Sequence, residues 1–286
     1  MNTSRNNTQT TLGRRSHLSL VGAMSLGIAA SGWLAQQAHA TNVDSEIVLL
    51  VDIVRPELSA NEFTRLLDGY ANSFTSSQIL DSIQSGVYGR IAVSMVLYGN
   101  ASTQVVGVPW MTIGNASEAQ TFASLVRNVT RPNQFATSDA GAALTAATLS
   151  FGSETGGTGN GFESAVQIIE VATSSFPPAS MAASTTASRT NALSSGVDLI
   201  NALALGNFAS SIESFYAANV IGSSLPGVVA TSSSAGFDGA LAATMGGMLA
   251  ETVQTGATVS VTAVPEPSLL ASLIPTTLLL LKRRRR

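Results

Sequence analysis

The distribution of apolar residues predicts alternating strands and helices between residues 46 and 252. Apolar or alternating runs typical of strands occupy residues 46–54, 90–99, 103–113, 164–172, 196–205 and 226–229. Between them, apolar residues recur at helical spacing, as in Phe63, Leu66 and Tyr70. Helices are predicted at 59–74, 139–149, 208–218 and 235–252, with a further one beginning near 115. This order favours an α/β fold with a doubly wound, mostly parallel sheet and helices on both faces.

Local signals mark where several of these elements begin or turn. Ser59 and Glu62 form a capping box at the start of the first helix, and Asn115 or Ser117 caps the next. That second helix is predicted to carry Phe122, Leu125 and Val126 on one face. Residues 90–99 and 103–113 are predicted to pair as a hairpin, in which Pro109 places the second strand at a sheet edge. Residues 152–161 are a predicted loop that lacks the Lys-Ser/Thr ending of a phosphate-binding loop. Residues 173–190 are predicted to be a loop that runs into a helix.

Residues 1–40 have the features of a secretory signal peptide. They contain no acid, the Arg14-Arg15 pair precedes an apolar stretch at 18–30, and small residues Ala38 and Ala40 stand before the predicted cleavage point. The alternative, a transmembrane anchor, needs a longer apolar span. The paired arginines leave both twin-arginine export and general secretion open.

The other end of the chain carries three features in order: Pro265-Glu266-Pro267, an apolar stretch at 268–281, and the basic run Lys282 to Arg286. A helix of that apolar length rises about 21 Å, short of a bilayer core of about 30 Å. Residues 264–286 resemble the PEP-CTERM sorting signal of Gram-negative, biofilm-forming bacteria. The resemblance implies transient membrane anchoring through this helix and cutting by an exosortase-type processing protease. Residues 256–286 are accordingly predicted to be a linker and sorting signal.

The residue types left between these two ends restrict the chemistry. His17 and His39 lie in the predicted signal peptide, Lys282 lies in the tail, and there is no cysteine. A body without these side chains lacks a Ser-His-Asp triad, a thiol nucleophile, a Schiff-base lysine, the usual zinc ligands and disulfides. Six arginines face 17 acids between residues 41 and 281, so we expect no nucleic-acid binding. The composition predicts a protein that is not an enzyme.

Three phrases of the body carry a family resemblance: VLLVDIVRPELSANEFTRLLDGYANSF, GRIAVSMVLYGNASTQVVGVPWMTI and YAANVIGSSLPGVV. Together they resemble a bacterial domain-of-unknown-function family related to the von Willebrand factor type A domain, over residues 44–253. The resemblance implies one von Willebrand factor A-like domain at 41–255, with a six-stranded sheet. It also implies a location for a divalent ion, the metal-ion-dependent adhesion site, at the carboxyl edge of that sheet.

Residue by residue, the resemblance implies a degenerate form of that site. In such domains the first strand is followed by Asp-x-Ser-x-Ser, a later loop adds a threonine, and an aspartate ends another strand. The matching positions are Asp52, Val54, Pro56, Ser138 (or its neighbour Thr137) and Glu170. Because Mg²⁺ needs about six hard oxygen ligands, two lost hydroxyls weaken any site at Asp52. No cofactor is expected, and Mg²⁺ at Asp52 is kept as an alternative.

Arg55 allows a second interpretation of the same loop. Its guanidinium could occupy the place of the cation and pair with both Asp52 and Glu170. The competing interpretation is a solvated loop arginine.

These features predict an exported, non-enzymatic binding or structural module at the cell surface or in the extracellular matrix of a Gram-negative bacterium. Its ligand would be an unidentified protein or polysaccharide. The alternative is a divalent-metal-dependent adhesion domain with an atypical ligand set. A glycosidase using Asp52 and Glu170 is disfavoured because only 6% of residues are aromatic, whereas sugar-binding surfaces usually use aromatic rings.

Overall fold

The computed structural model describes residues 40–55, 57–133, 137–152, 155, 157, 159–224, 231–234, 246–247 and 249–258. Several predicted features lie outside these residues: the apolar stretch at 18–30, Ala38, Pro56 and the Pro265–Pro267 motif. Residues 134–136 lie outside them as well, whereas Thr137 is described. Among the helices that are described, none has both the length and the hydropathy needed to cross a bilayer.

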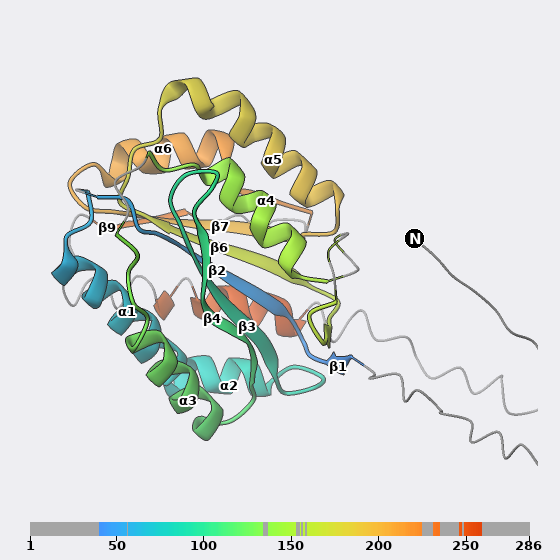
Figure 1. Ribbon diagram of the computed structural model, residues 1–286. Coiled ribbons are helices and arrows are strands. Elements are labelled where there is room, and N and C mark those ends of the chain that lie inside the picture. Colours follow the sequence, from blue (N-terminus) through green and yellow to red (C-terminus); the bar gives the residue numbers. More distant parts are fainter. Residues whose placement is uncertain are drawn as a thin grey trace, which may run out of the picture. The chain divides into compact units, whose positions relative to one another are not determined.

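The described strands form a central sheet of seven strands in the order β4-β3-β2-β6-β7-β8, with β9 also paired to β7 (Figure 1). Strands β3, β2, β6, β7 and β9 run parallel, whereas β4 and β8 are antiparallel to their neighbours. A separate two-stranded pair joins β1 to β5. The strand bounds are β1 Thr41–Asn42, β2 Glu46–Asp52, β3 Ile91–Tyr98, β4 Gln104–Ile113, β5 Phe162–Glu163, β6 Gln167–Thr173, β7 Leu199–Leu205, β8 Gly222–Ser223 and β9 Thr231–Ser234.

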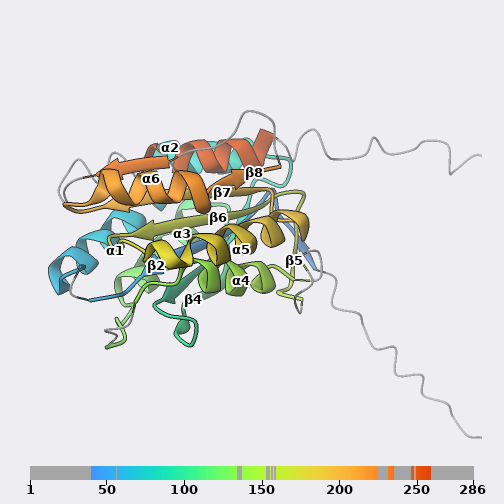
Figure 2. The ribbon, with the colours of Figure 1, turned by 90° about the horizontal axis from the view of Figure 1, so that it is seen from above.

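Helices cover both faces of this sheet. Their bounds are α1 Ala60–Phe74, α2 Ser77–Gln84, α3 Ala116–Arg127, α4 Ala140–Ser150, α5 Ala182–Ser194 and α6 Ala209–Asn219, and residues 249–258 are also helical. One buried apolar cluster joins the sheet to α1, α2, α3 and the 249–258 helix; a second joins the other face to α4, α5 and α6. Seen from above, α4, α5 and α6 run roughly along the strands (Figure 2). The predicted α/β class, with a mostly parallel sheet between two helical layers, is confirmed.

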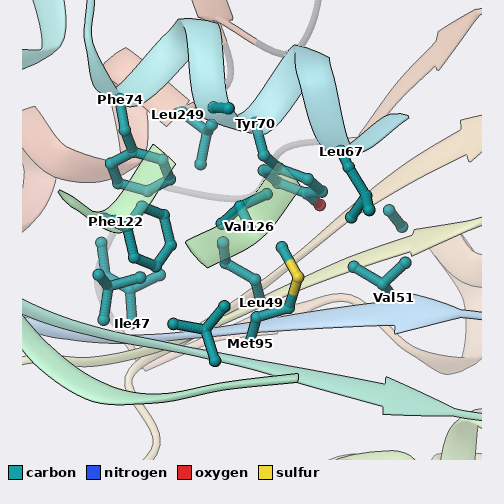
Figure 3. Close-up of a cluster of buried hydrophobic side chains, with 14 of the residues drawn as sticks. Ile47, Leu49, Val51, Leu67, Tyr70, Phe74, Met95, Phe122, Val126 and Leu249 are labelled. Carbon is teal, nitrogen blue, oxygen red and sulfur yellow. The ribbon is translucent and has the colours of Figure 1, made fainter. Parts of the chain in front are cut away.

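The first cluster is built from alternate side chains of the strands. Leu49 and Met95 point from β2 and β3 towards the rings of Tyr70, Phe74 and Phe122 (Figure 3). Phe74 and Phe122 meet edge to face, with ring centroids 4.9 Å apart. Because side chains alternate along a strand, residues 48, 50 and 52 of β2 face the other helical layer.

Several predicted element starts are confirmed. Ser59 Oγ accepts a hydrogen bond from the Glu62 amide at 3.2 Å, and Glu62 Oε2 accepts one from the Ser59 amide at 2.8 Å. Asn115 caps α3, and Asp139 caps α4. The predicted hairpin is observed, with β4 antiparallel to β3 at the edge of the sheet.

Other predictions differ from the structure. In the segment 173–190, predicted to be a loop that runs into a helix, α5 begins at Ala182, whereas α2 has no counterpart among the predicted helices. Helix α5 lacks an apolar stripe because it packs through small residues: a Cβ added to Gly141 of α4 would lie 3.2 Å from Thr185 Cα of α5. Of the three α3 residues predicted to share a face, Phe122 and Val126 are buried, whereas Leu125 is 42% exposed. The strand predicted at 226–229 and most of the helix predicted at 235–252 lie outside the described residues.

Candidate functional site

Asp52 lies at the carboxyl edge of the sheet, where the strand order reverses. From β2 the chain continues to β3 on one side and later returns to β6 on the other. In open α/β sheets this reversal is the usual ligand-binding position. Asp52 ends β2 and Thr173 ends β6, so parallel pairing brings both side chains to the same edge.

The carboxylate of Asp52 is almost fully buried, with 2% exposure, and both its oxygens accept hydrogen bonds. Oδ1 accepts from the amide of Val54 at 2.9 Å, and Oδ2 accepts from Thr173 Oγ1 at 2.6 Å. Thr173 Oγ1 in turn accepts from the Ser175 amide at 3.0 Å. Asp52 therefore ties the loop after β2 to the loop after β6.

Two serine hydroxyls lie close to the Asp52 carboxylate. Ser138, from the segment before α4, and Ser175, after β6, are buried, and neither Oγ atom has a hydrogen bond of regular geometry among the described residues. Ser138 and Ser175 lie close enough to Asp52 to lower the pKa of its carboxyl group.

Burial is the main cause of the raised pKa values of the titratable groups near Asp52. Desolvation raises the pKa of Asp52 above its usual value, although the bonds from Thr173 and the Val54 amide act in the opposite direction. Beneath it, the hydroxyls of Tyr98 and Tyr216 are 3.1 Å apart. Their pKa values are raised, first by burial, and the charge of Asp52 contributes to both shifts. These tyrosines remain neutral hydrogen-bonding groups.

A cation that was not predicted from the sequence holds the same loop. The guanidinium of Arg131 donates to the carbonyl oxygens of Ile53 at 2.8 and 3.1 Å, Val54 at 3.0 Å and Leu58 at 2.5 Å. It also lies over the Phe63 ring, 5.4 Å from the centroid. The fork geometry of arginine allows one side chain to bind several carbonyls at once. In the sequence, Arg131 stands in an irregular stretch between two helices, and no local motif marks this role.

Arg55 lies in this loop as well, half-buried, with its Nε shielded from solvent. Burial, followed by the charge of Arg55, lowers the pKa of Arg131, whereas Asp52 and Glu62 raise it. The two guanidinium groups are therefore neighbours. Pairing of Arg55 with Asp52 stays a prediction.

Glu170 does not join this site. It pairs with Leu49, three positions before the end of β2, and its side chain faces the α1 layer of the sheet. There it accepts hydrogen bonds from Asn201 and Thr252. The predicted grouping of Glu170 with Asp52 and Ser138 is therefore wrong, and so is an arginine bridging both carboxylates. The strand was predicted to end one residue early, which hid Thr173 as the residue that meets Asp52.

The residues at this edge do not fit a magnesium site of the expected kind. Both oxygens of Asp52 are already engaged, and Val54, at a ligand position, is a buried apolar side chain. The described residues contain no group of three or more His, Cys, Asp or Glu side chains that could hold a metal ion. One carboxylate with hydroxyl neighbours offers little of the ligand charge that a divalent ion needs.

Comparison with known proteins gives one family match. A family model described as "Protein of unknown function (DUF1194)" matches residues 42–247. No curated protein matches the chain.

Three solved structures illustrate the similarity of the fold. The pilus adhesin SpaC from Lactobacillus rhamnosus GG has a TM-score of 0.50 and 14% identity, covering 76% of this chain and 31% of its own. Proximal thread matrix protein 1 of the mussel byssus has a TM-score of 0.47 and 13% identity, covering 76% and 48%. A von Willebrand factor type A protein from Catenulispora acidiphila has a TM-score of 0.43 and 10% identity, covering 75% and 43%. The chain thus spans about a third to a half of the length of these proteins.

Proposed function

The chain belongs to the DUF1194 family of proteins of unknown function. We propose that it is a non-enzymatic binding module of the cell surface or extracellular matrix. The observation that carries the proposal is the state of Asp52. At the position where a binding site is expected, its carboxylate holds two loops together through hydrogen bonds. An edge fixed in this way can present a surface without an ion.

Exposed aromatic rings supply that surface. Phe176 follows β6 by three residues and is 52% exposed, and Phe208 follows β7 by three residues and is 65% exposed. Because β6 and β7 are parallel, both rings lie at the carboxyl edge that also holds Asp52. The ring of Phe215 on α6 supports Phe176, with centroids 6.2 Å apart. Exposed rings on a rigid frame are typical contact residues for protein or polysaccharide ligands.

The proposal includes the route by which the protein reaches its place. The signal peptide at 1–40 would direct export, and an exosortase-type protease would cut near Pro265-Glu266-Pro267. Before that cut, the apolar stretch at 268–281 would hold the chain at the membrane.

Replacing the two exposed rings tests the binding role. The Phe176→Ala and Phe208→Ala variants should retain less matrix material from the producing bacterium in a pull-down than the unchanged chain. Val87→Ala removes an exposed apolar side chain, 45% exposed, from the segment between α2 and β3 and is the control. Equal retention by all four proteins would contradict the proposed surface.

One observation favours a second candidate, a divalent-metal-dependent adhesion domain with an atypical ligand set. The hydroxyl groups of Ser138 and Ser175 are buried close to the Asp52 carboxylate, and hydroxyl oxygens can bind hard cations. Isothermal titration with Mg²⁺ or Mn²⁺ distinguishes the two candidates, because only the second predicts saturable heat that is lost in Asp52→Ala.

A further inference from the structure

Three polar side chains meet inside the apolar cluster on the α1 face of the sheet. Glu170 comes from β6, Asn201 from β7 and Thr252 from the helix at 249–258. Asn201 Nδ2 lies 2.9 Å from Glu170 Oε1 and 3.0 Å from Thr252 Oγ1, and Thr252 Oγ1 donates a short hydrogen bond to Glu170 Oε1. A hydroxyl, a carboxyl group and a primary amide therefore form a closed triangle.

This triangle is buried and incompletely paired. Glu170, Asn201 and Thr252 are 0%, 2% and 1% exposed. Glu170 Oε2 has no hydrogen-bond partner among the described residues, and neither has the nearby hydroxyl of Tyr70, which lies in the apolar cluster of Figure 3. Among the cations that the structure describes, none pairs with Glu170. Buried polar groups that are not fully satisfied are costly for stability alone and are common where chemistry takes place.

The three groups have the roles that acyl transfer requires. Thr252 supplies a hydroxyl nucleophile and Glu170 a base within hydrogen-bond reach of it. The same Glu170 oxygen also contacts the nitrogen of Asn201, the group that would leave. Burial raises the pKa of Glu170 to about 7, which suits a group that first accepts and then returns a proton near neutral pH.

We propose that Thr252 and Asn201 join through an intramolecular ester bond that Glu170 helps to form. Thr252 Oγ1 adds to the Cγ atom of Asn201 while its proton passes to Glu170. The Cγ–Nδ2 bond then breaks, Glu170 returns the proton to the nitrogen, and one ammonia leaves. The Oγ1–Cγ bond is the only new bond, the carboxyl group is regenerated, and no oxidant or reductant is consumed.

Fixed geometry and loss of the product favour the forward direction. Both partners are held by packed elements, so the reaction is effectively unimolecular. Ammonia becomes protonated in neutral water and is diluted away. The ester ties the 249–258 helix to the centre of the sheet across 51 positions of the chain, in a protein that has no cysteine for a disulfide. This inference goes beyond the proposed binding function and does not depend on it.

Mass spectrometry of the purified full chain tests the inference. Cleavage after glutamate places Asn201 in the peptide 171–213 and Thr252 in the peptide 252–266, with 214–251 between them. The expected result is one joined peptide whose mass equals the sum of both less one ammonia. Mild base should release it as two peptides, with aspartate at position 201. Recovery of both peptides unjoined, with Asn201 unmodified, would overturn the inference.

Substitutions distinguish the ester from other reactions that release ammonia. Thr252→Val and Glu170→Gln should abolish the joined peptide, whereas Thr252→Ser should retain it. Thr258→Val changes an exposed threonine of the same helix and should leave it intact. A succinimide at Asn160-Gly161 would have the same mass loss, but it would persist in Thr252→Val and would not join two peptides. A joined peptide that survives in Thr252→Val also contradicts the inference.

Discussion

At the scale of single residues, Asp52 and Glu170 show how position on a strand sets the task of a buried carboxylate. Asp52 ends its strand and receives two hydrogen bonds that connect loops. Glu170 lies within its strand and receives its two bonds from a neighbouring strand and a helix. Both are desolvated, and the pKa of each is raised above its usual value.

Removing the Asp52 carboxylate should destabilise the fold. In Asp52→Ala, the Val54 amide and the Thr173 hydroxyl lose their acceptor inside the protein, which costs about 1–3 kcal/mol per unsatisfied group. Urea unfolding of the variant measures this loss. Asp81→Ala, which changes an exposed acid on α2, should shift the free energy of unfolding by less than about 0.5 kcal/mol. Equal effects in the two variants would show that Asp52 is not a structural acceptor.

Glu170 should make stability depend on pH. Its pKa is raised from 4.5 to about 7 by burial, with a smaller rise from Glu251, while Thr252 and Asn201 lower it. Between these values the unfolded chain has released the proton that the folded chain still binds, so stability falls as pH rises. The contribution is fully present below the unfolded pKa and is lost through the folded pKa.

Urea unfolding across that pH range, compared with Glu170→Gln, reports this contribution as a difference in pH dependence, because the ester that the variant would also lose does not titrate. The unfolding free energy of the unchanged protein should fall more steeply with rising pH than that of the variant. A parallel pH dependence in the two proteins would refute the assignment. Tyr70 on α1 and Glu251 on the 249–258 helix are the other titratable groups near Glu170, and the comparison leaves both in place.

At the scale of elements, the carboxyl-edge loop depends on Arg131. Its guanidinium binds the carbonyl oxygens of residues 53, 54 and 58 and stacks on Phe63. Arg131→Leu should cost about 1–3 kcal/mol of unfolding free energy, because these carbonyls lose a charged donor. Arg131→Lys should lose part of this, since an ammonium group cannot bridge several carbonyls with a planar fork. Thermal unfolding of both variants checks the order, and a lysine variant less stable than the leucine variant would contradict it.

The order of strands and helices could be predicted from the sequence because, in most elements, the spacing of apolar residues and the helix-capping residues indicate the same element. The Ser59–Glu62 capping box and the apolar run of β2 are examples. The bounds of helix α5 could not be predicted, because it packs through small side chains against Gly141 and has no apolar stripe. For the site, Asp52 and Ser138 were predicted and lie together, whereas Thr173 was missed through a strand end placed one residue early. The role of Arg131 depends on contacts 73 to 78 positions away, which no local pattern reveals.

For the molecule as a whole, the two ends of the chain are predicted to be a signal peptide and a sorting signal, and the part between them is proposed to be a binding domain. Between residues 41 and 281 the chain has six arginines and 17 acids, and it has no cysteine, histidine or lysine there. The hydrogen-bonded carboxylate of Asp52 and the exposed rings of Phe176 and Phe208 lie at the same carboxyl edge of the sheet.

Export should change both ends of the chain. The mature protein should begin at Thr41, and it should lack the residues that follow the cut near Pro265-Glu266-Pro267. N-terminal sequencing and intact mass of the exported protein measure both. Ala38→Leu with Ala40→Leu should leave residues 1–40 attached, because the small residues read at the cleavage point are gone. A mature chain that still begins at Met1 would contradict the signal-peptide assignment.

If this edge of the sheet binds its ligand without a metal ion, retention of matrix material should not depend on a chelator. The exported chain is immobilised, and the matrix of the producing bacterium is passed over it in excess chelator and then in excess Mg²⁺. We expect equal retention in the two conditions, with a loss in Phe176→Ala in both. Retention that disappears in chelator and returns with Mg²⁺ would contradict this expectation.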